Sequence, residues 1–260
     1  MEKKRYSVLT YSIGDYERVK EVLNPKSDVE YIYVTDNKSI TSSTWTVKYV
    51  DNPHPEDPFY MCYDIRFNPF KYVNTDIVMR IDGSMKIVDD TDLLVNEFIS
   101  GDYDIMLMAH PSSQTLVEEY KAWEDYRGYP HERSEKILSL IRESGFDVDN
   151  YHGIYQGGFT IQRNNEANNH LNKKTLEILT ALAPEGKMIE RVDQTIWSYV
   201  ANRYHSDMKV MVVDYRVFNG HPILMWWHGD DENMFPPMYW GKETTPPMLF
   251  NHEVTIFYPY

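Results

Sequence analysis

The sequence predicts an α/β fold: a single domain with a mostly parallel, mixed sheet flanked by helices, followed by a C-terminal arm. Two observations lead to this prediction. Short apolar segments alternate with helical segments over roughly residues 6–200, as in chains that form parallel sheets with crossover helices. After residue 217 the composition shifts toward Pro, Met, Trp and Tyr. We therefore expect a domain over 1–217 and an aromatic, proline-rich arm over 218–260 that packs on it.

The first part of the chain is expected to contribute four strands and two helices. The strands are apolar and end in polar turns, and the first helix stops at Asn24-Pro25 because proline cannot continue a helix. The expected strands cover 6–13, 29–35, 45–50 and 76–81, and the expected helices cover 16–23 and 59–72.

The rest of the domain is expected to continue the same alternation. Gly128 and Pro130 interrupt a long helical region. The expected helices cover 89–100, 113–143 with a break around 128–130, 166–182 and 190–203, and the expected strands cover 103–109, 159–162 and 209–213.

Polar loops follow three of the expected strands, over 12–16, 36–39 and 82–84. The carboxyl ends of parallel strands lie at one edge of a sheet, and ligands of such folds bind in the crevice outside that edge. The three loops should therefore converge on one ligand site.

The formal net charge is −14, from 40 acidic and 26 basic residues. This field repels a polyphosphate backbone, so we expect no nucleic-acid partner. A nucleoside diphosphate remains compatible, because one divalent cation or local basic groups offset its charge. Aromatic residues make up 14% of the chain. Such rings cover sugar faces in carbohydrate sites, but they also pack in ordinary cores.

Cysteine content and apolar runs bear on the compartment. The only cysteine is Cys62, so neither an internal disulfide nor a cysteine-rich metal site is expected. The chain runs from Met1 straight into an apolar strand without a signal-peptide core, and no apolar run approaches the ~20 residues that span a bilayer. We expect a soluble, cytoplasmic protein without a transmembrane segment.

The segment Asp82-Gly83-Ser84, after the strand over 76–81, suggests a specific chemistry. Transfer of a sugar from a nucleotide requires neutralisation of the departing diphosphate, which a divalent ion held by carboxylates provides. Mg²⁺ and Mn²⁺ prefer oxygen ligands and need only one or two from the protein. An acid at a strand end, followed by small residues that let phosphates approach, meets this need. Asp-Gly is also an ordinary turn sequence, and that alternative stays open.

Several segments match the motifs of one family in the order in which they occur along the chain. Residues 78–87 are similar to a strand-and-turn motif written WIDG(N/S)-x-x-I. The other matching segments are 10–16, 31–37 with Trp45, 64–72, His110-Pro111 with Glu118-Glu119, 156–159 with Arg163-Asn164, and Asp193-Gln194. In this order the chain resembles a glycosyltransferase-like family long catalogued as a domain of unknown function.

That family is similar in turn to glycogenin-like retaining glycosyltransferases. The resemblance implies a GT-A fold, a UDP- or GDP-linked sugar donor, and Mn²⁺ or Mg²⁺. It places the nucleoside against Thr10, Tyr11 and Ser12, with Asp36 at the end of the next strand as an acceptor for the base or ribose. Ordinary turn chemistry explains Asp36 nearly as well. The resemblance places the diphosphate at Asp82, Gly83 and Ser84.

The metal site implied by the resemblance departs from the family pattern. Glycogenin-like enzymes carry Asp-x-Asp at this strand end, whereas Ser84 stands here where the second acid would fall. Asp82 is then the implied carboxylate ligand. His228, which follows an apolar run in the late position of the family's His-x-x-Gly, is the implied second ligand. Packing within an aromatic loop explains His228 equally simply, and His221 is a weaker competitor.

The resemblance also suggests residues around the sugar. Asp193 and Gln194 are placed in the cleft, where Asp193 would face the anomeric carbon or the acceptor hydroxyl. A role as a helix cap explains Asp193 as well. Gly157 and Gly158 would allow the backbone to approach the sugar closely.

The remaining candidates are charged or polar side chains. Arg66 is preferred over Lys71 and Arg163 as a partner for phosphate. Glu119, with its neighbour Glu118, could supply a base or sugar contacts, although acids on helices are mostly solvated. His110 and His152 are candidates for polar lining.

The functional hypothesis is transfer of a sugar from a nucleotide diphosphate to a glycan or other hydroxyl acceptor, with surface polysaccharide synthesis as one setting. Similarity to glycogenin-like enzymes favours retention of configuration, whereas inversion would need Glu119 or Asp193 as base. A non-catalytic glycan-binding or scaffold protein is the first alternative. A nucleotidyltransferase ranks last, because no glycine-rich basic loop follows the first strand. The arm could also dock on a second copy of the chain. The hypothesis requires Asp82 to project into a pocket shared by neighbouring loops.

Overall fold

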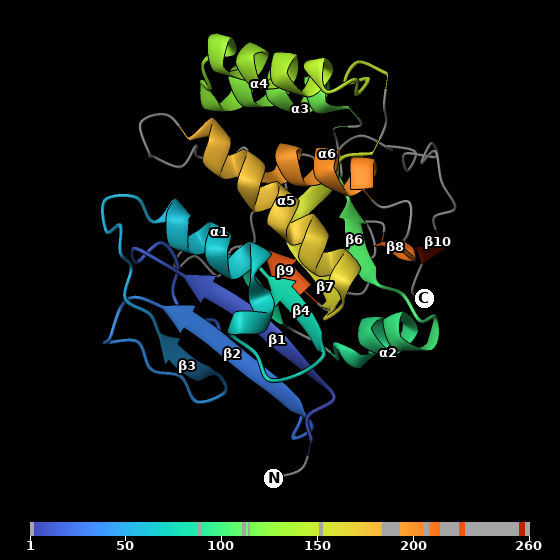
Figure 1. Cartoon of the computed structure of the whole chain (residues 1–260). Helices are drawn as coiled ribbons and strands as arrows, with labels where there is room; N and C mark the ends of the chain where they lie inside the picture. The colour runs from blue at the N-terminus through green and yellow to red at the C-terminus, as the bar shows by residue number, and fades with distance from the viewer. Residues whose placement is uncertain are drawn as a thin grey trace.

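The protein is described by a computed structural model in which residues 3–87, 90–110, 113, 115–150, 153–183, 193–204, 208–213, 224–226 and 255–257 are placed. These residues form an α/β fold with a mixed sheet flanked by helices (Figure 1). The strand order in the large sheet is β10-β8-β6-β7-β4-β1-β2-β3. Its strands are β1 (Tyr6–Ser12), β2 (Val29–Thr35), β3 (Thr46–Tyr49), β4 (Ile77–Ile81), β6 (Ile105–Ala109), β7 (Tyr155–Arg163), β8 (Val210–Val213) and β10 (Thr255–Phe257).

Only β7 runs against the other described strands of this sheet. It pairs antiparallel with β4 and β6, and the remaining neighbours pair in parallel. The prediction of a mostly parallel, mixed sheet flanked by helices is therefore confirmed. A separate small sheet pairs β5 (Met85–Ile87) with β9 (Leu224–Trp226) in antiparallel fashion.

Helices cover both faces of the sheet. On one face, Leu94, Val95 and Phe98 of α2 pack in a core with alternate side chains of the strands, such as Val8 and Met79. On the other face, α1 packs against β1 and β4 through Ile65, while α5 and α6 cover the region of β6 and β7 (Figure 1). The helices are α1 (Phe59–Phe67), α2 (Asp92–Ser100), α3 (Leu116–Arg127), α4 (His131–Glu143), α5 (Glu166–Leu182) and α6 (Asp193–Tyr204).

Helix ends follow local sequence rules. The side chain of Thr115 accepts from the backbone of Glu118, and Glu118 reciprocates, which is a capping box at the start of α3. Gly128, with a φ of 63°, ends the helix, and α4 begins after Pro130. The expected break around 128–130 is thus confirmed, and Glu118 serves as a cap.

Two expected helices differ from the structure. Residues 16–23 form no helix, so that prediction is wrong. Side chains from elsewhere take up the backbone groups of this segment: Thr44 accepts from the Val22 N–H and the Trp45 indole donates to the Lys20 carbonyl. The expected helix over 59–72 ends at Phe67, because Asn68 precedes Pro69 and leaves the helical conformation, and a 3₁₀ turn over Pro69–Lys71 follows.

Strand predictions were accurate for the central strands and incomplete elsewhere. β7 begins at Tyr155, four residues before the expected start, and β5 was not expected. Within the expected arm the structure describes only β9 and β10, and these add to the two sheets. The arm's other residues lie outside the described part of the chain. None of the described helices is long and apolar enough to cross a membrane.

Candidate functional site

The carboxyl ends of β1, β2, β4 and β6 lie at one edge of the sheet, and antiparallel β7 begins there. The pairing of Ile81 with Phe159 sets Asp82 beside Gly158, and the Asp82 N–H donates to the Gly158 carbonyl over 2.8 Å. The topology therefore brings together two segments, at Asp82 and Gly157-Gly158, that were proposed separately from the sequence.

Asp82 is held by two arginines through one of its carboxylate oxygens. Its Oδ1 lies 2.6 Å from Nη2 of Arg66 and 3.2 Å from Nη1 of Arg80. The side chain of Asp82 is 28% exposed, against 13% for Arg66 and 3% for Arg80. Among the described residues, no hydrogen bond or ion pair reaches Oδ2 of Asp82. Within the described part of the chain, the carboxylate thus uses one oxygen for ion pairs and leaves the other without a bond.

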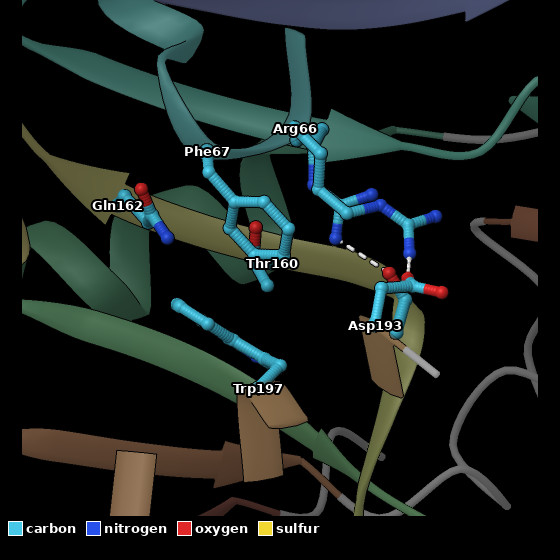
Figure 2. Close-up of a pocket in the computed structure, with 8 residues that line it drawn as sticks. Arg66, Phe67, Thr160, Gln162, Asp193 and Trp197 are labelled. Carbon is cyan, nitrogen blue, oxygen red and sulfur yellow. Dashed lines mark hydrogen bonds and ion pairs between the residues drawn. The ribbon is translucent and has the colours of Figure 1, made fainter. Parts of the chain in front are cut away.

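Arg66 links Asp82 to the start of α6. Its Nη1 forms an ion pair with Oδ2 of Asp193, and its Nε donates to the Tyr11 hydroxyl over 3.1 Å. Figure 2 shows Arg66 and Asp193 pointing toward each other, with Phe67 and Trp197 on the other side of the pocket. The guanidinium therefore lies between two carboxylates from different elements.

Burial shapes the ionisation of the groups around Asp82. Burial, together with the charge of Arg66, lowers the pKa of Arg80 to about 10. For Arg66 burial acts in the same direction, but the charge of Asp82 and the interactions with Tyr11 and Tyr63 together outweigh burial and raise the pKa. Burial raises the pKa of Tyr11 to about 12, so its hydroxyl stays protonated at neutral pH. Two arginines and two acids make this cluster close to neutral.

Arg80 is a site residue that the sequence reasoning missed. Its Nη2 donates to the Gly157 carbonyl over 2.6 Å, so it fixes the start of β7 as well as Asp82. Side chains two residues apart in a strand point to the same face. An arginine inside an apolar strand, two residues before Asp82, was the available signal.

Gly83 lies too close to neighbouring backbone for a side chain, whereas the atoms nearest a Cβ on Gly158 are the ends of side chains. A Cβ on Gly83 would lie 2.5 Å from the Tyr11 carbonyl oxygen. A Cβ on Gly158 would lie 2.8 Å from Oε1 of Gln156 and 3.2 Å from Oδ2 of Asp82. At Gly157 the nearest atom would be 3.4 Å away, an ordinary contact.

Gln194 and Glu119 form a second, buried polar network behind Gly157. The Gln194 Oε1 accepts from the Gly157 N–H over 2.9 Å, and its Nε2 donates to Oε1 of Glu119 over 2.7 Å. The other oxygen of Glu119 accepts from the Ser113 hydroxyl and lies 3.5 Å from Nε2 of His110. Burial lowers the pKa of His110, and the charge of Glu119 partly opposes this. Glu119 thus supports Gln194 and, through it, the glycine backbone.

Ser12 and Asp36, two of the residues proposed to hold the nucleoside, lie where β1 and β2 end at this edge of the sheet. The Asp36 carboxylate accepts from the Gly14 N–H over 3.0 Å, and the Ser12 hydroxyl accepts from the Glu17 N–H over 2.9 Å. Thr10 is buried, and its hydroxyl has no partner among the described residues. Ser12 and Asp36 therefore both hold the turn after β1, and Asp36 links it to the end of β2.

Other candidates lie apart from Asp82 or outside the described residues. Arg163 lies opposite Ile77 in the register of β7 and β4, at the other end of these strands from Asp82. Its Nε donates to the Tyr103 carbonyl. Lys71 is exposed and forms an ion pair with Asp64. His152, His221 and His228 lie outside the described part of the chain.

A small pocket lies beside the ion pairs. Its volume is about 10 Å³, and it is lined by Arg66, Phe67, Arg80, Gly157, Thr160, Gln162, Asp193 and Trp197 (Figure 2). The Thr160 hydroxyl and the Trp197 indole N–H have no hydrogen-bond partner among the described residues. This space suits about one water molecule, whereas ligand pockets measure several hundred Å³. Asp82 belongs to this cluster but does not line the pocket, so the expected shared pocket is not seen among the described residues.

The donor set around Asp82 does not suit a resident divalent ion. Within the described residues, no three His, Cys, Asp or Glu side chains come together as a metal cluster. Asp193, the acid that shares Arg66 with Asp82, is paired to that arginine, and Ser84 is buried next to Gly83. A cation at Oδ2 of Asp82 would lie beside two fixed positive charges. The chemistry of these residues therefore fits hydroxyl groups better than a metal.

No protein-family model matches the sequence, and no curated protein matches it.

Proposed function

We propose that the chain is a glycosyltransferase that moves a sugar from a nucleotide diphosphate to a hydroxyl acceptor, with a GT-A-like sheet as its scaffold. The observation that carries the proposal is the position of Asp82. This partly exposed carboxylate lies at the carboxyl edge of a mostly parallel sheet, held by Arg66 and Arg80 and next to close-packed glycines. Ligands of open α/β sheets bind at such edges.

In the proposed reaction, the acceptor oxygen forms a bond to the anomeric carbon while the bond from that carbon to the phosphate oxygen breaks. The nucleotide diphosphate leaves with the electron pair, and the acceptor proton passes to that phosphate or to a carboxylate. Asp193 is the carboxylate assigned to the sugar or acceptor side, because Arg66 connects it directly to Asp82. No step is assigned to a metal, since the described donor set does not fit one.

The network behind the glycines supports the same proposal. Gln194, which donates to Glu119, accepts from the Gly157 N–H, and Arg80 donates to the Gly157 carbonyl, so both sides of this peptide segment are fixed. Electrostatic groups fixed before the substrate binds need little reorganisation during reaction. We assign Gln194 and Glu119 to positioning rather than to proton transfer.

The direct test is binding of a panel of nucleotides and nucleotide sugars, measured by thermal unfolding. At a concentration about 100 times Kd, binding stabilises the folded state by ~2.7 kcal/mol, which raises Tm by several degrees. The shift should disappear in Asp82→Ala. The matched control is Asp149→Ala, which removes an exposed acid that also pairs with an arginine, Arg142. Absence of stabilisation by every nucleotide, with and without Mn²⁺, would contradict the proposal.

A non-catalytic glycan-binding protein is the second candidate. The observation that favours it is that both acids of the cluster already pair with Arg66, as in a structural ion-pair network. Retained affinity for glycans together with no affinity for nucleotides would support this alternative over transfer.

A further inference from the structure

The position of Arg66 determines which ligands the two acids can accept. Its Nη2 is 2.6 Å from Oδ1 of Asp82, and its Nη1 pairs with Oδ2 of Asp193. A divalent ion shared by two carboxylates would need the place between them that this guanidinium takes. The cluster therefore already contains a cation at the bridging position.

Displacement of Arg66 by a metal ion is unfavourable for two reasons. Arg66 extends from α1, its side chain is only 13% exposed, and its Nε also donates to the Tyr11 hydroxyl. A buried arginine that loses its carboxylate partners is left as an uncompensated charge. Displacement of the Arg66 side chain from the cluster would therefore disrupt the contact of α1 with the strand ends.

A second positive charge adds to the repulsion. Arg80 lies 3.2 Å from the same Oδ1 and is almost fully buried. The lowered pKa of Arg80 reflects its burial and the charge of Arg66, which indicates that positive charge is already crowded here. A divalent ion at the free Oδ2 would face both guanidinium groups across one carboxylate.

From these contacts we infer that the Asp82 site takes no divalent cation and that Arg66 and Arg80 compensate the carboxylate in its place. Oδ2 of Asp82, which makes no bond to any described residue, then accepts hydrogen bonds from neutral hydroxyl groups of the ligand. Binding of a nucleotide or nucleotide sugar is independent of Mg²⁺ and Mn²⁺. The statement about nucleotide binding rests on the proposed function, whereas the statement about divalent cations does not.

The first experiment uses Mn²⁺ alone as the probe and does not depend on any nucleotide. Titration of the full chain with Mn²⁺, followed by the electron paramagnetic resonance of the free ion, should show no binding that depends on Asp82. Wild type and Asp82→Asn should give superimposable curves. Saturable Mn²⁺ binding that is lost in Asp82→Asn would overturn the inference.

A gain of binding tests the part assigned to Arg66. In Arg66→Ala the carboxylates of Asp82 and Asp193 lose the bridging charge, so Asp82-dependent Mn²⁺ binding should appear. Arg142→Ala, which removes a surface arginine paired with Asp149 and Glu135, is the matched control and should gain none. A folded Arg66→Ala protein that gains no Mn²⁺ binding would overturn the role given to Arg66.

The last arm separates this inference from the proposed function. UDP and GDP are titrated calorimetrically in EDTA and, separately, in Mn²⁺. Equal affinity in the two buffers supports the inference, and binding only in Mn²⁺ overturns it while the proposed function stands. Absence of nucleotide binding in both buffers contradicts the proposed function, and the experiments with Mn²⁺ alone then decide the inference.

Discussion

Arg66 and Asp82 are joined by an ion pair of 2.6 Å that connects α1 to the end of β4. The two residues are 16 positions apart in the sequence, and the pair is only partly open to solvent. Removal of one partner of a largely buried pair leaves the other charge without compensation. The Arg66–Asp82 pair is therefore expected to affect both the stability and the ligand chemistry of this edge of the sheet.

Substitution of Arg66 by Ala should destabilise the protein by about 3–5 kcal/mol, because Asp82 and Asp193 both lose a cationic partner. Urea denaturation measures this loss. The double variant Arg66→Ala/Asp193→Ala should be less destabilised than the sum of the two single variants, since one acid no longer remains unpaired. Additive effects would show that Arg66 and Asp193 do not act as a pair.

Gly83 and Gly157 provide a comparison of two glycines in one site. In Gly83→Ala the new methyl group would meet the Tyr11 backbone at 2.5 Å, so the turn must shift, at an expected cost of about 1–3 kcal/mol. In Gly157→Ala the nearest atom lies 3.4 Å away, and the cost should be well below that of Gly83→Ala. Thermal unfolding of both variants checks the order, and an equal or larger loss in Gly157→Ala would contradict it.

The sequence predicted the sheet well because its central strands are mostly apolar runs bounded by polar turns. β1 and β4 are buried at every position, and such runs between polar turns are recognisable without tertiary information. The segment over 16–23 was mispredicted as a helix for the opposite reason. Its backbone partners, among them Thr44 and Trp45, come from a distant part of the sequence.

The candidate site was predictable in part. Asp82, Arg66, Asp193 and the glycines at 157–158 were expected at one site, and the structure brings them together. That Arg66 bridges two acids could not be predicted, because the pairing depends on how α1 and α6 pack on the sheet. Arg80 could have been found from the two-residue period of β4 alone.

Gln194 is expected to act by position, through its bonds to Gly157 and Glu119. Gln194→Leu should cost about 1–3 kcal/mol for each buried group that it leaves without a partner. Glu119→Gln keeps an acceptor for Gln194 and should cost less than Gln194→Leu. Urea denaturation of the two variants tests this order.

Activity gives an independent readout on Glu119 once a donor has been found. As a positioning residue, Glu119 should leave the pH dependence of kcat unchanged when it is replaced by Gln. If Glu119 were the general base, its replacement by Gln would instead remove one limb of the pH profile together with most of kcat. Loss of that limb in Glu119→Gln would assign Glu119 to proton transfer.

Asp92 predicts how the protein responds to acid. Burial alone would raise its pKa, but hydrogen bonds from Lys26, Arg5 and Tyr6 outweigh burial and lower the pKa of Asp92 to about 2, from an ordinary value of 3.8. Since the folded-state pKa is the lower one, the unfolded chain binds the proton more tightly. The contribution is therefore complete above about pH 4 and is lost as the pH falls toward about 2, with a size of about 2 kcal/mol.

Urea denaturation at several pH values between about 5 and 3 tests this expectation. In Asp92→Asn the free energy of unfolding should fall at the upper end of this range, and its decrease toward acid pH should become shallower than in wild type. Asp28→Asn is the control, because Asp28 is more exposed than Asp92 and, among the described residues, forms an ion pair only with Arg5. Its acid limb should stay close to that of wild type, since the network of Asp92 with Lys26 and Tyr6 is retained. Parallel acid limbs for Asp92→Asn and wild type would show that Asp92 does not carry this pH dependence.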